Sequence, residues 1–121
     1  MTNLDIKAHL LRTLKNEKIL NLTGDKKVHF LHANNPEVPY IEYEILRESG
    51  GSYSEGKETF TNYLVQVDIF SQNDYSDLER EIKIAMLNAG YTRDQARDLY
   101  EKETKLKHKA MRFNISLPFS L

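Results

Sequence analysis

The side chains most able to do chemistry are three carboxylates in two segments of strand-like pattern. Glu42 and Glu44 stand in "PYIEYEILRE", and Asp68 interrupts the apolar stretch "NYLVQVDIFS". Hydrolases use clustered carboxylates as general acid and base, but these need a cleft and a neighbour that shifts a pKa. A flat sheet face provides neither, so a small hydrolase is the third and weakest of the hypotheses for function.

Histidines, glycines and cysteines supply no further catalytic motif. His29 and His32 in "HFLH" would point to opposite faces of a strand, and no third ligand stands nearby. The glycine-rich stretch before Lys57 lacks the G-x-x-x-x-G-K-[ST] spacing of a phosphate-binding loop. The chain has no cysteine, which excludes disulfides and thiolate chemistry. We therefore expect no enzyme activity, no cofactor and no metal.

Composition narrows the class of protein. The 121 residues suit one α+β domain over 1–121, and 17 Lys and Arg nearly balance 18 Asp and Glu. A general grip on nucleic acid needs a clear basic excess on one face. No segment has the apolar length of a membrane helix or the pattern of a signal peptide. The alternative function is a small nucleic-acid-binding domain that uses Tyr53, Tyr63, Phe70 and the run Lys102 to Lys109.

Periodicity predicts two helices and a set of strands. Helices are expected from about Asn3 to Asn16 and over "NDYSDLEREIKIAMLNAGY". The first would bury an apolar stripe made of Leu4, Ala8, Leu11 and Leu14. Strands are expected at Tyr40–Arg47, Tyr63–Phe70 and Met111–Leu117, with short ones in "KKVHFLH" and near Leu99–Glu103. The glycine-rich segment Ser49–Thr59 is predicted to be a mobile loop, too long for a tight hairpin. The fold class is α+β: an antiparallel sheet with two helices packed on one face.

The alternation of residues assigns two faces to this sheet. One face is apolar and should hold the helices; from the central strand it takes Tyr63, Val65, Val67 and Ile69. The second sheet face is mixed, because Gln66 and Asp68 share it with apolar residues. Two interpretations stay open, a solvated face or a subunit interface. The candidate interface consists of Tyr40, Leu64, Asp68, Phe70 and Arg112, with Asp68 held by the forked guanidinium of Arg112.

From Pro39 onward the chain resembles a family of small phage proteins. It shows a Pro-aromatic-aliphatic strand, a V-D-I-aromatic strand, an amphipathic helix ending near Gly-aromatic, and a final "H-[KR]-x-x-R-F" strand. The matching positions are Pro39, Tyr40, Val67, Asp68, Ile69, Phe70, Gly90, Tyr91, His108, Lys109, Arg112 and Phe113. In this order they resemble the tail-completion (tail-terminator) proteins of phages and prophages with long non-contractile tails.

The resemblance implies a structural role without catalysis or cofactor. Such proteins form a ring, commonly a hexamer, that caps the tail tube at the head–tail junction. The expected partners are other copies of the chain, the tail tube protein and the head connector proteins, with no membrane and no specific nucleic acid. The expected location is the host cytoplasm during assembly and then the virion. A ring subunit needs two different patches that meet head-to-tail, which fits an interface on the second sheet face.

Overall fold

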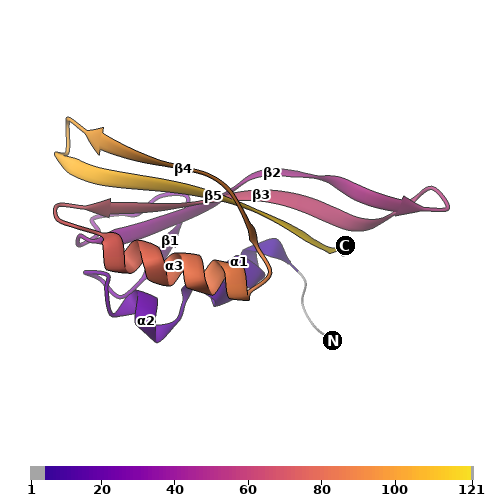
Figure 1. The fold of residues 1–121 in the computed structure, drawn as a ribbon, viewed down its shortest axis with the longest axis horizontal. Helices are drawn as coiled ribbons and strands as arrows, with labels where there is room; N and C mark the ends of the chain where they lie inside the picture. Colours follow the sequence, from indigo (N-terminus) through magenta and orange to yellow (C-terminus); the bar gives the residue numbers. More distant parts are fainter. Residues whose placement is uncertain (1–4, 121) are drawn as a thin grey trace.

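The computed structural model describes residues 5–120, which form one five-stranded sheet and three helices (Figure 1). The elements in chain order are α1 (Ile6–Leu14), α2 (Glu17–Leu20), β1 (Val28–Phe30), β2 (Tyr40–Ser54), β3 (Lys57–Ser71), α3 (Ser76–Asn88), β4 (Thr92–Glu101) and β5 (Leu106–Pro118). The predicted α+β class is confirmed, with the four-residue α2 as an unexpected third helix. No helix among the described residues is long and apolar enough to cross a membrane.

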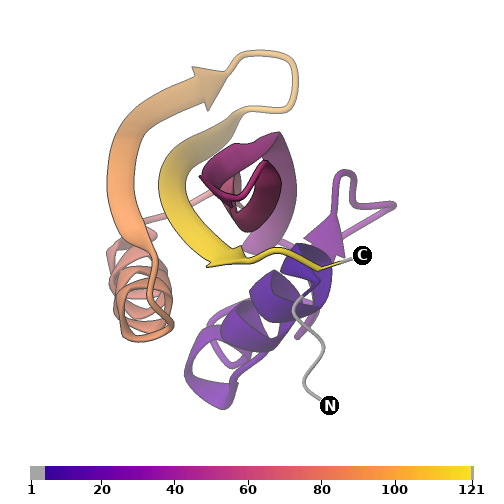
Figure 2. The same ribbon diagram turned by 90° about the vertical axis from the view of Figure 1, so that its right-hand side faces the viewer.

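The strand order is β1-β2-β3-β5-β4. All neighbours pair antiparallel except β1, which runs parallel to β2. The sheet is strongly twisted and curved. Viewed down its long axis, β5 and β4 bend around the β2–β3 hairpin (Figure 2). This curvature brings side chains of β3, β5 and β4 together on the second sheet face.

The apolar face of the sheet meets the helices as predicted. Val65, Val67 and Ile69 of β3 are fully buried, and Phe113 of β5 is 1% exposed. Helix α3 contributes Leu78, Ile82 and Met86 to the same core. The register expected from the period-two alternation is therefore correct, because a slip by one residue would have exposed Val67.

Helix α1 differs from the expected helix in its buried side. Its start near Asn3, and Leu4 of the expected stripe, lie outside the described residues. Asp5 caps the helix by accepting a hydrogen bond from the backbone N–H of Lys7. The residues that α1 buries are Ile6, Leu10 and Leu14, whereas Leu11 is 36% exposed. The buried stripe follows a spacing of four residues from Ile6 and includes Leu14, as expected, whereas the expected burial of Leu11 is wrong.

The predicted mobile loop Ser49–Thr59 is wrong, because these residues continue β2 and β3 to a two-residue turn. Glu55 and Gly56 both have positive φ, 52° and 78°, as in the tight type I′ turn that matches strand twist. The glycines before the turn serve the strand. A Cβ on Gly50 would lie 2.0 Å from the hydroxyl oxygen of Tyr53, so its absence leaves room for that ring. The hairpin extends well beyond the other strands (Figure 1).

The ambiguous segment after α3 is also a strand. β4 covers Thr92–Glu101, which includes most of the short strand expected near Leu99–Glu103. The register between β4 and β5 shifts between Arg93 and Ala96. This bulge breaks the alternation of side chains along β4.

Candidate subunit interface

Asp68 is buried within the single chain, at 6% exposure. Its Oδ1 lies 2.7 Å from Nε2 of His108, and the side-chain amide of Gln66 donates to the same oxygen at 2.9 Å. The contact with His108 joins β3 to the neighbouring strand β5, and the contact with Gln66 lies within β3. A carboxylate in the most apolar strand is therefore accommodated by hydrogen bonds, as a buried charge requires.

The expected direct pair between Asp68 and Arg112 does not form. Their strands are neighbours and their side chains share the second sheet face, as predicted. However, the Nε of Arg112 donates to Oε1 of Gln66 at 2.9 Å, so Gln66 stands between guanidinium and carboxylate. In the β3–β5 register Asp68 pairs with Ala110, which leaves His108 and Arg112 as its two diagonal neighbours. Of these two diagonal neighbours, His108 is the one that contacts the carboxylate of Asp68 directly.

An aromatic stack lies beside this network on the same face. The ring of Phe70 stacks on Tyr40 with centroids 4.8 Å apart, and on the imidazole of His108 at 4.2 Å. These rings come from three adjacent strands, β2, β3 and β5, in that order. The stack covers Phe70 to 7% exposure, so an apolar residue on the second face is buried without a partner subunit.

The five candidate interface residues therefore differ in what they leave exposed. Asp68 and Phe70 are buried, Tyr40 and Leu64 are half-buried, and Arg112 is exposed. The interpretation of the second sheet face as fully solvated is thus wrong at Asp68 and Phe70. The side chains still able to contact a partner are Tyr40, Leu64 and Arg112.

Charge is distributed unevenly across the second sheet face. Its β2 side carries Glu42 and Glu44, and burial raises the pKa of the Glu44 carboxyl above its usual range. The carboxylates of Asp68 and Glu42 raise that pKa further, while the guanidinium of Arg112 opposes them. The opposite side, on β5 and β4, carries Arg112 and Arg97. The separation is incomplete, because β2 also carries Arg47, in register with Leu64, and Glu101 of β4 lies 3.7 Å from Nδ1 of His108.

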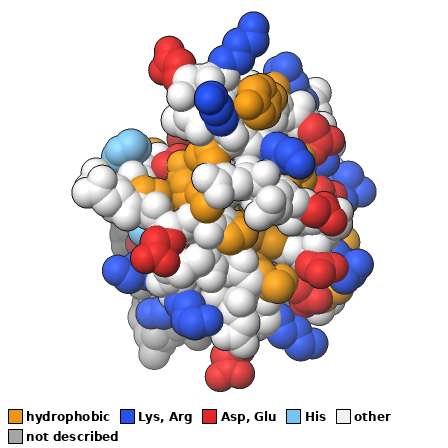
Figure 3. Space-filling model, turned by 90° about the vertical axis from the view of Figure 1, so that its left-hand side faces the viewer, with side chains coloured by type: hydrophobic (Ala, Val, Ile, Leu, Met, Phe, Trp, Pro, Cys, Tyr) orange, Lys and Arg blue, Asp and Glu red, His pale blue; other side chains and the backbone are white. Residues whose placement is uncertain are grey.

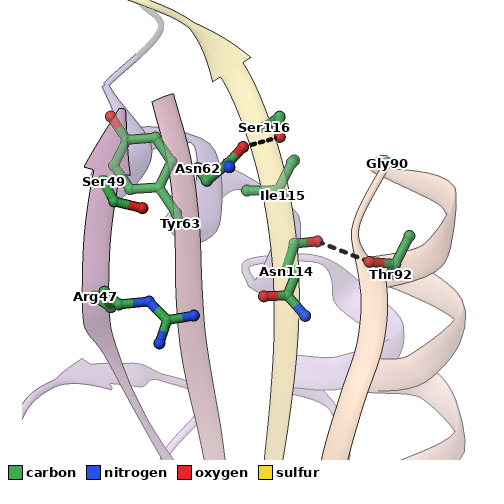
Figure 4. A pocket seen from close by; sticks show the side chains of 9 residues that line it. All are labelled: Arg47, Ser49, Asn62, Tyr63, Gly90, Thr92, Asn114, Ile115 and Ser116. Atoms are coloured by element: carbon green, nitrogen blue, oxygen red, sulfur yellow. Dashed lines mark hydrogen bonds between the residues drawn. The ribbon is translucent and has the colours of Figure 1, made fainter. Parts of the chain in front are cut away.

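Among the hollows along the sheet, two are lined by residues of β3, β4 and β5. The larger, of about 400 Å³, lies where β2, β3, β5 and the start of β4 meet, and its walls are mostly polar (Figure 4). There Ser116 donates to Asn62, and Thr92 donates to the backbone carbonyl of Asn114 at 3.4 Å. The smaller, of about 240 Å³, is lined mainly by polar and basic side chains: Gln66, Gln95, Arg97, His108 and Arg112. Neither hollow combines a nucleophile with a base.

The metal and nucleic-acid interpretations gain no support from the described residues. No group of three or more His, Cys, Asp or Glu among residues 5–120 could hold a metal, and His29 is paired with Asp25 at 2.7 Å. In the basic run, Lys109 is held by Glu79 and Asp98, at 3.6 and 3.3 Å. At the end of the molecule shown in Figure 3, charges of both signs surround apolar side chains. Stacking through Phe70 is blocked by its own neighbours.

Sequence reasoning missed three residues of this face, namely Gln66 as a bridge, His108 as the partner of Asp68, and Arg97. The parity of positions could have revealed two of them. His108 is four residues from Arg112 and Gln66 is two from Asp68, so each pair shares a face of its strand. Arg97 lies in the segment whose structure the sequence left open.

Comparison of the sequence with protein-family models and with curated proteins finds no match. Among solved structures, the fold is similar to a chain in the virion of a native gene transfer agent particle. The TM-score is 0.65 at 10% identity, and the match covers 94% of this chain and 95% of that one. At this identity the likeness shows a shared fold, with nearly the whole of each chain included.

Proposed function

We propose that this chain is a structural assembly protein of a phage or prophage particle. More specifically, it is a single-domain, ring-forming tail-completion subunit at the head–tail junction. The observation that carries the proposal is the fold shared, almost from end to end, with a chain of a gene transfer agent virion. The ordered series of motifs from Pro39 to Phe113, which resembles tail-completion proteins, supports the finer assignment.

The second sheet face suits such a role. A closed ring needs two different patches on each subunit that meet head-to-tail. The β4–β5 side of the second sheet face, with Arg97 and Arg112, is a candidate for one of these two patches. In a ring, Tyr40, Leu64 and Arg112 would contact the neighbour, with Asp68 and Phe70 supporting them from beneath.

The test is to purify the full chain and measure its mass by light scattering over a wide concentration range. We expect a discrete oligomer that appears as rings in electron micrographs and binds one end of purified tail tubes. The tail tube protein and the head connector protein would come from the same phage or prophage. A chain that stays monomeric at all concentrations, and does not bind tube ends or connectors, would exclude the proposal.

A further inference from the structure

The β2–β3 hairpin forms an arm that reaches away from the rest of the chain. The last pair between β3 and β5 is Phe60 with Pro118, so residues 51–58 pair only within the hairpin. A two-stranded ribbon alone is marginally stable in water. It also exposes aromatic surface, since Tyr53 is 64% and Phe60 42% exposed. An arm with these properties is suited to lie against another protein surface.

The end of the arm is acidic. Residues 51–58 contain Glu55 and Glu58 against a single Lys57, a net charge of −1 (two carboxylates and one ammonium). Glu55 occupies the turn itself and is exposed. Its carboxylate is therefore presented at the outermost point of the arm.

The smaller hollow on the second sheet face offers the opposite charge. Within residues 5–120, Arg97 has no carboxylate within 4.0 Å of its guanidinium. Arg112 uses Nε to hold Gln66, which leaves its two terminal nitrogens as donors, with Glu44 the acid that influences it. The hollow between these arginines, with the amides of Gln66 and Gln95, can receive one or two carboxylates.

The arm of one copy cannot reach the hollow of the same copy. Gln66 lines the hollow and the turn is at Gly56, ten positions earlier on β3. At about 3.3 Å per residue, a strand of this length separates them by roughly 30 Å. The arm also points away from the β4–β5 end of the sheet (Figure 1). A contact between the two sites must therefore join different copies, in the head-to-tail manner that closes a ring.

Glu58 is half-buried and accepts a hydrogen bond from Thr61, so Glu55 is the free carboxylate of the tip. We propose that the arm tip of one copy, carrying Glu55, binds in the hollow between Arg97 and Arg112 of the next copy. This inference rests on the proposed ring-forming function and names the contact that would build the ring. The partner is a second copy of the chain, because the same chain supplies both the exposed Glu55 carboxylate and a hollow lined by Arg97 and Arg112.

A charge-swap experiment on the full-length chain tests this contact. Arg97→Glu and Glu55→Lys should each weaken self-association at least tenfold, measured by sedimentation over a concentration series. The double variant Arg97→Glu/Glu55→Lys should regain wild-type association. An equimolar mixture of the two single variants should also assemble into rings with an even number of subunits, because each tip then meets a hollow of opposite charge. Lys18→Glu, on the exposed surface of α2, is the matched control and should have no effect.

A further variant separates charge from folding of the arm. Glu55→Asn removes the carboxylate while placing a residue better suited to the left-handed turn, so the hairpin stays intact. It should weaken association although its thermal unfolding is unchanged or improved. If the wild type forms rings and all these variants associate as well as it does, the arm contact is excluded and the ring function stands. A wild-type chain that never self-associates would exclude both the arm contact and the ring-forming function.

Discussion

The imidazole of His108 lies 2.7 Å from the carboxylate of Asp68, although the two residues are not direct partners in the β3–β5 register. With Gln66 they form a hydrogen-bonded chain that ends at Arg112. The polar group that interrupts the most apolar strand is thus satisfied inside one chain. We therefore expect a substitution of Asp68 to affect mainly the folding of the subunit and to affect assembly only indirectly.

Replacing Asp68 should destabilise the isolated subunit. Asp68→Ala removes the carboxylate that is hydrogen-bonded to both Gln66 and His108, at a cost of about 1–3 kcal/mol in free energy of unfolding. Urea denaturation measures this, with Glu48→Ala at an exposed position of β2 as control. In a double-mutant cycle, His108→Ala should cost less in the Asp68→Ala background than in the wild type. Additive costs would show that the contact contributes no stability.

The identity of the partner of Asp68 could not have been deduced from the sequence. Alternation places Asp68, His108 and Arg112 on one face, and an antiparallel register makes both of the latter diagonal neighbours. Which diagonal is shorter depends on the twist of the two strands, and twist is a property of the whole sheet. The sequence therefore predicted the face correctly but assigned the wrong partner to Asp68.

Other parts of the fold differed in how clearly they were encoded. Val65, Val67 and Ile69 alternate with polar residues strictly enough to fix the core face of β3. By contrast, β4 has charged residues on both faces and a bulge after Arg93, so neither a helical nor a strand period emerges. The arm was mistaken for a loop because Gly50 and Gly51 suggest flexibility, and because its turn uses Glu-Gly in place of the more familiar Asn-Gly.

The core prediction concerns Phe113, which is 1% exposed on the helix-facing side of β5. Phe113→Ala should lower the free energy of unfolding by about 3–5 kcal/mol, through lost burial and the cavity left behind. Phe60→Ala is a matched control, because Phe60 is 42% exposed on the arm and should cost much less. Similar losses for the two variants in the monomer would contradict the assigned faces of the sheet.

Glu44 gives the second sheet face a pH dependence. Its pKa is raised in the folded chain above the ordinary 4.5, so the folded state holds this proton more tightly than the unfolded chain does. The resulting stabilisation is fully present below pH 4.5 and is lost as pH rises through the higher folded pKa. Glu44→Gln mimics the protonated form, so we expect it to be more stable than the wild type at pH 7.

The measurement for Glu44 is the difference in unfolding free energy between Glu44→Gln and the wild type from pH 3.5 to 7.5. The difference should approach zero at the acidic end and grow through the window above pH 4.5. Glu48→Gln, at an exposed position of β2, is the control for a general loss of negative charge. A difference that is independent of pH would mean that Glu44 titrates alike in both states.

The turn of the arm provides a prediction about local stability. Glu55 has a φ of 52°, and this left-handed conformation costs a residue other than glycine about 1–2 kcal/mol. Asn adopts it most readily among those residues. Glu55→Asn should therefore slow amide hydrogen exchange in residues 50–60, while exchange in the core strands stays the same. Gly56→Val, at a φ of 78°, should have the opposite effect. Unchanged exchange in both variants would mean that the turn does not limit opening of the arm.

Tyr53 separates the arm's role in assembly from its role in folding. The ring is 64% exposed, so Tyr53→Ser should change the stability of the monomer by less than about 0.5 kcal/mol. If the arm docks on a neighbouring copy, the same ring becomes buried there, and aromatic anchors of this kind contribute about 2 kcal/mol or more to an interface. Self-association should then weaken at least tenfold.

Tyr100→Ser is the matched control, because Tyr100 is 59% exposed on β4 and faces away from the basic hollow. Equal losses for Tyr53→Ser and Tyr100→Ser, or no loss for either, would count against docking through the arm.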